Sequence, residues 1–230
     1  MNPPSVHTAL SPAATAAGRA RARARRLLVP VLALGAIIAV GTVLWHRVPM
    51  RTRIAWEGYR SALFSAGPVL AIGDSITYQA APASLCGEKV TNAAVPGDRI
   101  GDLLARAPVL LRLMEPKRVV VAIGINDTGP GHMDIAEWRA RYRTLLGLFP
   151  KSSLVLVEVN PVDPGHPGYV PLHDRDFIAR QNATIRTLAQ ETGASVVPAP
   201  AAVATVDGLH LTREGVAQWR QRLAAAGCAG

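Results

Sequence analysis

Charged residues are scarce and unevenly placed in this sequence of 230 residues. Residues 1–60 contain nine arginines and a single acid, Glu57, which gives them a net charge of +8, and the whole chain carries +9. Subtracting the first value from the second leaves a net charge of +1 for residues 61–230. A nearly neutral segment has no basic surface to follow phosphates, which excludes nucleic acid as a partner.

Repeats and metal-binding patterns are missing too. No segment of the chain repeats, and two histidines and two aspartates gather in "GHPGYVPLHDRD", residues 165–176. Their spacing fits no common zinc pattern, and Asp174 and Asp176 suit the start of a helix. We therefore expect no metal there, and we interpret this loop as a wall of a substrate cleft.

The one long apolar run without charge is "LLVPVLALGAIIAVGTVLW", residues 27–45. As a helix it would be about 28 Å long, close to the thickness of the hydrocarbon core of a bilayer. Arginines are denser before it than after it, which predicts an Arg-rich cytoplasmic tail at 1–26 and a transmembrane signal-anchor at 27–45. The alternative is a signal peptide cleaved near Gly41. With either an anchor or a signal peptide, the rest of the chain is expected to be exported.

Residues 68–230 alternate short apolar runs with amphipathic stretches, and residues 46–67 form a juxtamembrane connector before them. Runs rich in valine and isoleucine predict five strands at 68–73, 89–94, 118–124, 152–159 and 194–199. Apolar residues at helical spacing predict helices at 99–114, 134–149, 174–192 and 212–227. The predicted fold class is α/β, a flavodoxin-like three-layer sandwich with a five-stranded parallel sheet, preceded by one transmembrane helix.

Polar residues follow three of these strands, at the sheet edge where such folds carry their functional loops. Ser75 in "GDSIT" stands between the first strand and a helix, Gly97 in "VPGDRI" follows the second strand, and Asn126 in "GIND" follows the third. Taken singly, they fit a helix cap, a turn and an Asx-turn. A G-x-S-x-G nucleophile elbow is absent, because residue 77 is threonine.

The stretch "VDGLHLTREG", residues 206–215, places Asp207 three residues before His210. A carboxylate so placed can accept a hydrogen bond from Nδ1 of the imidazole, which leaves Nε2 to take a proton from a serine. Attack by that serine on an ester creates an oxyanion that needs hydrogen-bond donors. The Ser75 amide, the Gly97 amide and the Asn126 side chain are candidates for these donors.

These four blocks, in this order, resemble those of the SGNH (GDSL) hydrolase family and span residues 68–215. The resemblance implies a serine esterase in which Ser75 is the nucleophile, His210 moves the proton and Asp207 orients His210. It also implies an acyl-enzyme intermediate and no metal or organic cofactor. The SGNH hydrolase domain would occupy residues 68–230.

The predicted anchor suggests a periplasmic or extracellular site, where acylated glycans or lipids of the cell envelope are the available esters. Two other functions remain open at this point. An O-acyltransferase would use the same triad to pass the acyl group to a sugar hydroxyl. A non-catalytic envelope-binding module would keep the fold without the reaction.

If the domain is exported, its two cysteines can form a disulfide, because an oxidising compartment permits one. Cys86 lies between the first helix and the second strand, and Cys228 lies at the end of the last helix. In flavodoxin-like winding both positions fall at the sheet edge opposite the active site, and the two helices share one face. We therefore predict a Cys86–Cys228 disulfide.

Overall fold

The computed structural model describes residues 41–64, 66–150 and 152–228. The chain divides between Pro49 and Met50 into two units. In the first, residues 41–47 are helical. The predicted tail at 1–26, and the predicted anchor up to residue 40, lie outside the described residues. Within the ranges given above, no helix combines the length and the apolar character needed to cross a membrane.

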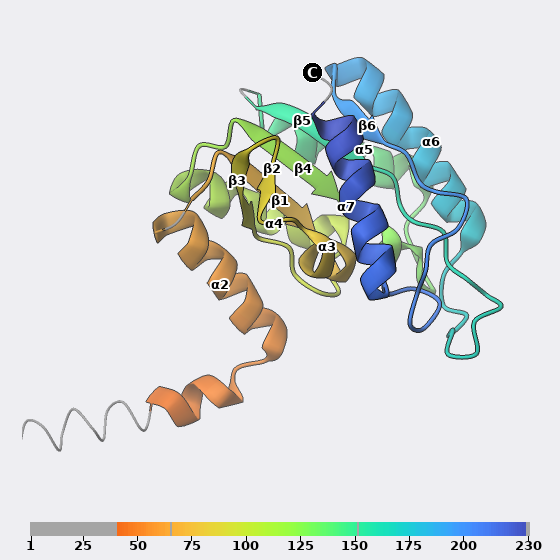
Figure 1. Cartoon of the computed structure of the whole chain (residues 1–230), viewed down its shortest axis with the longest axis horizontal. Helices are drawn as coiled ribbons and strands as arrows, with labels where there is room; N and C mark the ends of the chain where they lie inside the picture. Colours follow the sequence, from red (N-terminus) through yellow and green to blue (C-terminus); the bar gives the residue numbers. More distant parts are fainter. Residues whose placement is uncertain (1–40, 65, 151, 229–230) are drawn as a thin grey trace, which may run out of the picture. The chain divides into compact units, whose positions relative to one another are not determined.

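The second unit, residues 50–230, is built on a six-stranded sheet with the order β2-β3-β1-β4-β5-β6 (Figure 1). All five predicted strands are present and parallel, as β1 (Val69–Gly73), β3 (Glu88–Asn92), β4 (Arg118–Ala122), β5 (Ser153–Val157) and β6 (Ser195–Val197). β1 is buried along its whole length, which explains its continuous apolar run.

The prediction of five parallel strands was wrong at one edge of the sheet. β2 (Ser84–Leu85) pairs antiparallel with β3, so the sheet is mixed and has six strands. Cys86 and Gly87 form the two-residue connection, with φ of 53° and 77°. Positive φ at both residues is typical of a type I′ hairpin turn. A strand of two residues is too short for its side-chain pattern to reveal it.

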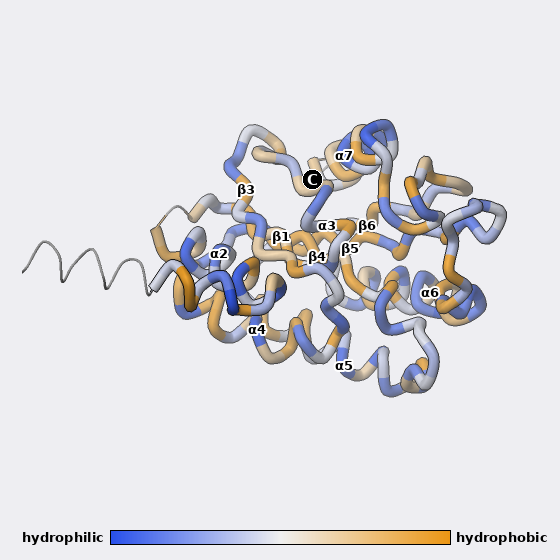
Figure 2. Tube along the Cα trace, turned by 90° about the horizontal axis from the view of Figure 1, so that it is seen from below, coloured by the Kyte–Doolittle hydropathy of each residue, from blue (hydrophilic) through white to orange (hydrophobic). Residues whose placement is uncertain are grey.

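Helices cover both faces of the sheet. Figure 2 shows α7 on one side and α4 and α5 on the other. The helices that follow strands are α3 (Ser75–Ala80), α4 (Ile100–Leu113), α5 (Ile135–Gly147), α6 (Arg175–Thr192) and α7 (Arg213–Gly227). α3 packs against α7, as the predicted winding requires. The side chains of Asp134, Asp174 and Thr212 cap their helices as N-cap residues.

The connector predicted at 46–67 contains a regular helix, α2 (Met50–Phe64), which belongs to the second unit. α2 packs on β3 and α4 and buries Ile54, Gly58 and Ala62. A Cβ atom at Gly58 would lie 3.2 Å from the Cα of Ala93. Glycine therefore lets α2 lie close to the backbone that leads out of β3.

The predicted disulfide is confirmed. Cys86 and Cys228 are bonded, and their Cα atoms are 5.5 Å apart. Cys86 lies in the β2–β3 turn, and Cys228 is the C-cap residue of α7. The bond joins the last helix to the edge of the sheet where β3 begins.

Candidate active site

The turn between β1 and α3 places Ser75 at the carboxyl end of β1, one of the inner strands of the sheet. A Cβ atom at Gly73 would come within 2.2 Å of the Ala122 carbonyl oxygen and 2.3 Å of Thr77 Oγ1, so only glycine fits there. Thr77 Oγ1 donates a hydrogen bond of 3.0 Å to the same carbonyl. The turn is thereby packed against β4, and Ser75 remains partly exposed at its tip.

Ser75, His210 and Asp207 form a continuous hydrogen-bonded row. Ser75 Oγ lies 3.0 Å from Nε2 of His210, and Nδ1 of His210 lies 2.7 Å from Oδ2 of Asp207. Burial raises the pKa of Asp207, but hydrogen bonds from His210 and Leu209 outweigh it and lower that pKa to about 2. Asp207 is therefore an ionised acceptor, Nδ1 carries the proton, and Nε2 can accept the proton of Ser75.

The loop that carries Asp207 and His210 is held on several sides. Oδ1 of Asp207 accepts hydrogen bonds from the backbone N–H groups of Leu209 and His210, at 3.0 and 2.7 Å. Gln79 of α3 donates to the carbonyl of Leu211 at 2.9 Å. Gly208 has a φ of 84°, and a Cβ atom there would lie 2.7 Å from the Cβ of Tyr169. The imidazole is therefore set in place before any substrate binds.

The two other predicted oxyanion donors lie at the ends of the neighbouring strands. The backbone N–H of Val95 donates to the carbonyl of Gly73 at 3.0 Å, which fixes the loop of Gly97 to the end of β1. Asn126 lies in the 3-10 helix η1 (Ile125–Thr128), and its Nδ2 donates to the Asp98 carbonyl at 2.9 Å. That bond uses one of the two hydrogens on Nδ2, and the other can serve an oxyanion.

Two buried carboxyl groups flank these residues and accept hydrogen bonds from the backbone. Asp74 accepts from the N–H of Ile76 at 3.0 Å, and Asp127 accepts from the N–H of Ile100, the first residue of α4, at 3.1 Å. Burial raises the pKa of Asp74 to about 7 and that of Asp127 to about 6. Both are structural groups that fix the turns around the site.

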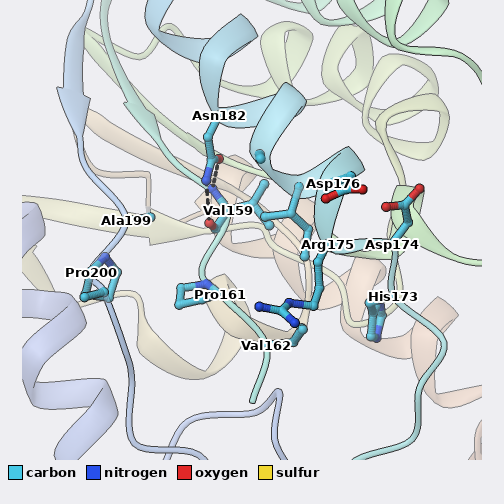
Figure 3. Close-up of a pocket in the computed structure, with 13 residues that line it drawn as sticks. Val159, Pro161, Val162, His173, Asp174, Arg175, Asp176, Asn182, Ala199 and Pro200 are labelled. Atoms are coloured by element: carbon cyan, nitrogen blue, oxygen red, sulfur yellow. Dashed lines mark hydrogen bonds between the residues drawn. The ribbon is translucent and has the colours of Figure 1, made fainter. Parts of the chain in front are cut away.

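An open hollow of about 820 Å³ lies at the carboxyl ends of β5 and β6 (Figure 3). Val159, Pro161 and Val162 after β5, residues 199–201 and the start of α6 line it. His173 lies on its wall and connects it with the active-site loops, because its Nδ1 lies 2.9 Å from Oγ1 of Thr128 in η1. Burial lowers the pKa of His173, and the charge of His210 lowers it further.

The loop at 165–176, predicted to wall a cleft, contributes His173, Asp174, Arg175 and Asp176 to this hollow. His166 instead accepts a hydrogen bond from the backbone of Gly168. Asp174 pairs with His132, whose Nε2 lies 3.1 Å from Oδ2, a contact that no local pattern in the sequence indicated. In the part of the chain that is described, no three histidine, cysteine or acidic residues lie close enough together to hold a metal ion.

The doubly wound sheet and the Ser-His-Asp row at its carboxyl edge are those of a serine hydrolase. Residues 71–218 match the GDSL-like Lipase/Acylhydrolase family. The chain belongs to this family and is an acylhydrolase that acts on esters. No curated protein sequence matches the chain.

Solved structures share the fold. A protein from Streptococcus pneumonia named for platelet activating factor has a TM-score of 0.66 and 21% identity, over 81% of this chain and 97% of its own. The lipase/acylhydrolase from Enterococcus faecalis has a TM-score of 0.57 and 19% identity, over 68% and 93%. A variant of Axe2, an acetyl-xylooligosaccharide esterase from Geobacillus Stearmophilus, has a TM-score of 0.54 and 21% identity, over 67% and 91%.

Proposed function

We propose that this protein is a membrane-anchored serine esterase that removes acyl groups from glycans or lipids of the cell envelope. Ser75 attacks the ester carbonyl, and His210 takes the serine proton and returns it to the leaving alcohol. Asp207 holds His210 in the tautomer that this exchange needs. The amides of Ser75 and Gly97 and the side chain of Asn126 hold the oxyanion, and water then hydrolyses the acyl-enzyme.

The observation that carries this proposal is the hydrogen-bonded row from Ser75 Oγ to Asp207 Oδ2. Its two distances, 3.0 and 2.7 Å, lie within the range expected of a nucleophile with its base and of a base with its orienting group. A binding module that had lost catalysis would have no need for an ionised carboxylate aimed at the imidazole. The row therefore favours an enzyme over such a module.

The substrate class that we favour is an acyl ester, in particular an acetyl ester, of a sugar hydroxyl. The open hollow beside the site has room for a sugar, and polar groups line it, among them His173, Arg175 and Asp176. Axe2, which shares the fold, is an esterase of acetylated xylooligosaccharides. An anchor at 27–45 would keep the enzyme beside the envelope, where such esters occur.

The test of the nucleophile is Ser75→Ala in the full-length chain. We expect ester hydrolysis to be lost and the circular dichroism spectrum to be unchanged, because the serine lies at a partly exposed turn. Covalent labelling by a fluorophosphonate should disappear with it. Residual hydrolysis above about a few per cent of wild type would contradict the assignment, since removal of a nucleophile costs several orders of magnitude.

The substrate is tested with acetylated oligosaccharides, product release being followed with and without a sugar acceptor. Free acetate in both cases supports the esterase. Transfer of the acetyl group to the acceptor would instead identify an O-acyltransferase that uses the same residues.

The anchor is tested separately by topology. Reporters fused before residue 27 and after residue 230 should lie in the cytoplasm and outside it, respectively, and the protein should stay in the membrane after carbonate extraction. A released mature chain that begins near Thr42 would contradict the anchor and support a cleaved signal peptide.

A further inference from the structure

Gly97 lies in a tight turn that is held by its neighbours. Asp98 donates its backbone N–H to the Val95 carbonyl at 3.1 Å, which closes a four-residue turn around Pro96 and Gly97. Gly97 has a φ of 79°. Proline followed by glycine at positive φ is the arrangement of a type II turn. The direction of the Gly97 N–H is thus set by how this turn is held.

Asp98 connects this turn to the second oxyanion donor. Its carbonyl accepts the hydrogen bond from Asn126, and its own backbone directly follows Gly97. A displacement of Asp98 would therefore move both the Gly97 amide and the Asn126 side chain. The family match begins at residue 71 and includes both donors, but it does not include α2, the helix that packs beside this turn.

Two arginines hold the carboxylate of Asp98, whose side chain is only 2% exposed. Arg106 of α4 donates to Oδ2 through Nε, at 3.0 Å, and through Nη2. Arg51 of α2 donates through Nη2 to Oδ1 at 2.9 Å. The contact with Arg106 is buried, whereas the Arg51 side chain is 54% exposed and lies across the outside of the turn.

Arg51 also lies over Gly97 itself, because a Cβ atom on Gly97 would be 3.5 Å from Nε of Arg51. The guanidinium further approaches Asp102 of α4 at 3.6 Å. α2 is held in place behind it by the packing of Gly58 on Ala93 and by its buried residues. Arg51 thus connects α2 with the turn.

We propose that α2 contributes to catalysis, because its residue Arg51 is a positioning residue for the oxyanion hole. Through Asp98 it holds the Gly97 amide and the Asn126 side chain where the developing oxyanion needs them. The inference rests on the proposed function, because it takes Gly97 and Asn126 to be oxyanion donors. The inference adds that catalysis depends on α2, a helix outside the family match. Catalysis would then depend on the part of the chain that precedes the predicted hydrolase domain.

The test compares Arg51→Met and Arg51→Lys with Arg60→Met, a control at an exposed arginine on the same helix. Full-length variants in detergent hydrolyse 4-nitrophenyl acetate, and rates are expressed per site titrated with a fluorophosphonate. We expect Arg51→Met to lower kcat about tenfold, since small displacements of catalytic groups are costly, and to leave KM within about twofold. Arg106 still pairs with Asp98, so thermal stability should change little.

Arg51→Lys keeps a charge within reach of Asp98 and should restore most of kcat, whereas Arg60→Met should behave as wild type. A kcat of Arg51→Met within about twofold of wild type would overturn the inference. So would a loss that appears only as fewer titratable sites and a lower melting temperature, which is the result expected of a purely structural ion pair. Ser75→Ala is measured alongside: if it retains activity, the proposed function itself is wrong, whatever Arg51→Met does.

Discussion

The carbonyl oxygen of Asp98 accepts a hydrogen bond of 2.9 Å from the side-chain nitrogen of Asn126. This bond joins the loop after β3 to the 3-10 helix after β4, on the two sides of β1, the strand that leads to Ser75. It fixes the direction of the Asn126 amide without using both of its hydrogens. In the proposed mechanism this amide is therefore directed before substrate binds, as electrostatic catalysis requires.

Asn126→Ala should therefore act on the chemical step. We expect it to cost about 3 kcal/mol of transition-state stabilisation, which is typical of one lost oxyanion donor. The effect should appear in kcat, with KM little changed, in steady-state hydrolysis of a soluble ester. If KM rose alone, Asn126 would be a substrate-binding residue instead.

The substitution Asp207→Asn should lower activity strongly, because the hydrogen bonds of the loop fix how an asparagine would be oriented. Oδ1 of Asp207 accepts two backbone N–H groups, so the oxygen of an asparagine would stay there and its NH₂ would face Nδ1 of His210. That arrangement places the imidazole proton on Nε2, which can then no longer accept from Ser75.

We expect Asp207→Asn to lower kcat roughly 10³- to 10⁴-fold with the fold intact. Asp134→Asn is the matched control, because Asp134 only caps α5 and asparagine is an equally good N-cap. Near-normal kcat in Asp207→Asn would show that the tautomer is set by another group.

The disulfide should contribute to stability and not to catalysis. Cys86 and Cys228 are 142 residues apart, and they meet where β3 begins, at the edge opposite Ser75. Replacing both by serine should lower the free energy of unfolding by at most about 5 kcal/mol on the chain-entropy estimate. Urea denaturation measures this effect. A fall in kcat under conditions where the double variant is folded would contradict the separation of the bond from the site.

Asp74 should make stability depend on pH. Its pKa rises from 3.8 in the unfolded chain to about 7 in the folded one, so the folded state binds more protons between these values. Stability should therefore fall as the pH rises from about 4 to 7, by about 4 kcal/mol at most. Asp127, whose pKa is also raised by burial, acts in the same direction.

Asp74→Asn keeps an oxygen for the Ile76 N–H and removes the titration. The variant should show a flatter dependence of melting temperature on pH, and above pH 7 it should be more stable than wild type. A wild-type melting temperature that rises between pH 5 and 7, unaffected by Asp74→Asn, would contradict the role given to this carboxyl.

Much of the fold could be read from local patterns. The apolar runs at 68–73 and 118–124 indicated buried strands because parallel strands are covered on both faces. Asp134, Asp174 and Thr212 indicated helix starts because capping is a contact between near neighbours in sequence. The disulfide was predicted through one further step, since regular winding alone brings Cys86 and Cys228 to the same edge.

The residues of the candidate site also fall into those that the sequence predicted and those that it did not. Ser75, Asp207 and His210 could be predicted as a set because their short blocks resemble those of a known family. Ser75 begins α3, whereas Asp207 and His210 share the loop that precedes α7. β2 could not be predicted, because two residues carry no periodicity. The contact of Arg51 with Asp98 could not be predicted either, because the two residues are 47 positions apart and meet only when α2 packs on β3 and α4.

What the sequence by itself determined was therefore the order of the elements, the edge at which the polar residues gather and the pairing of the cysteines. These follow from hydrophobic periodicity, turn chemistry and the handedness of the winding, which are properties of neighbouring residues. Only the tertiary structure decided which carboxylates are buried, that Asp98 joins Gly97 to Asn126, and that Arg51 of α2 contacts Asp98. Those relationships depend on side chains that meet across the packed helices and loops, and no local pattern along the chain encodes such a meeting.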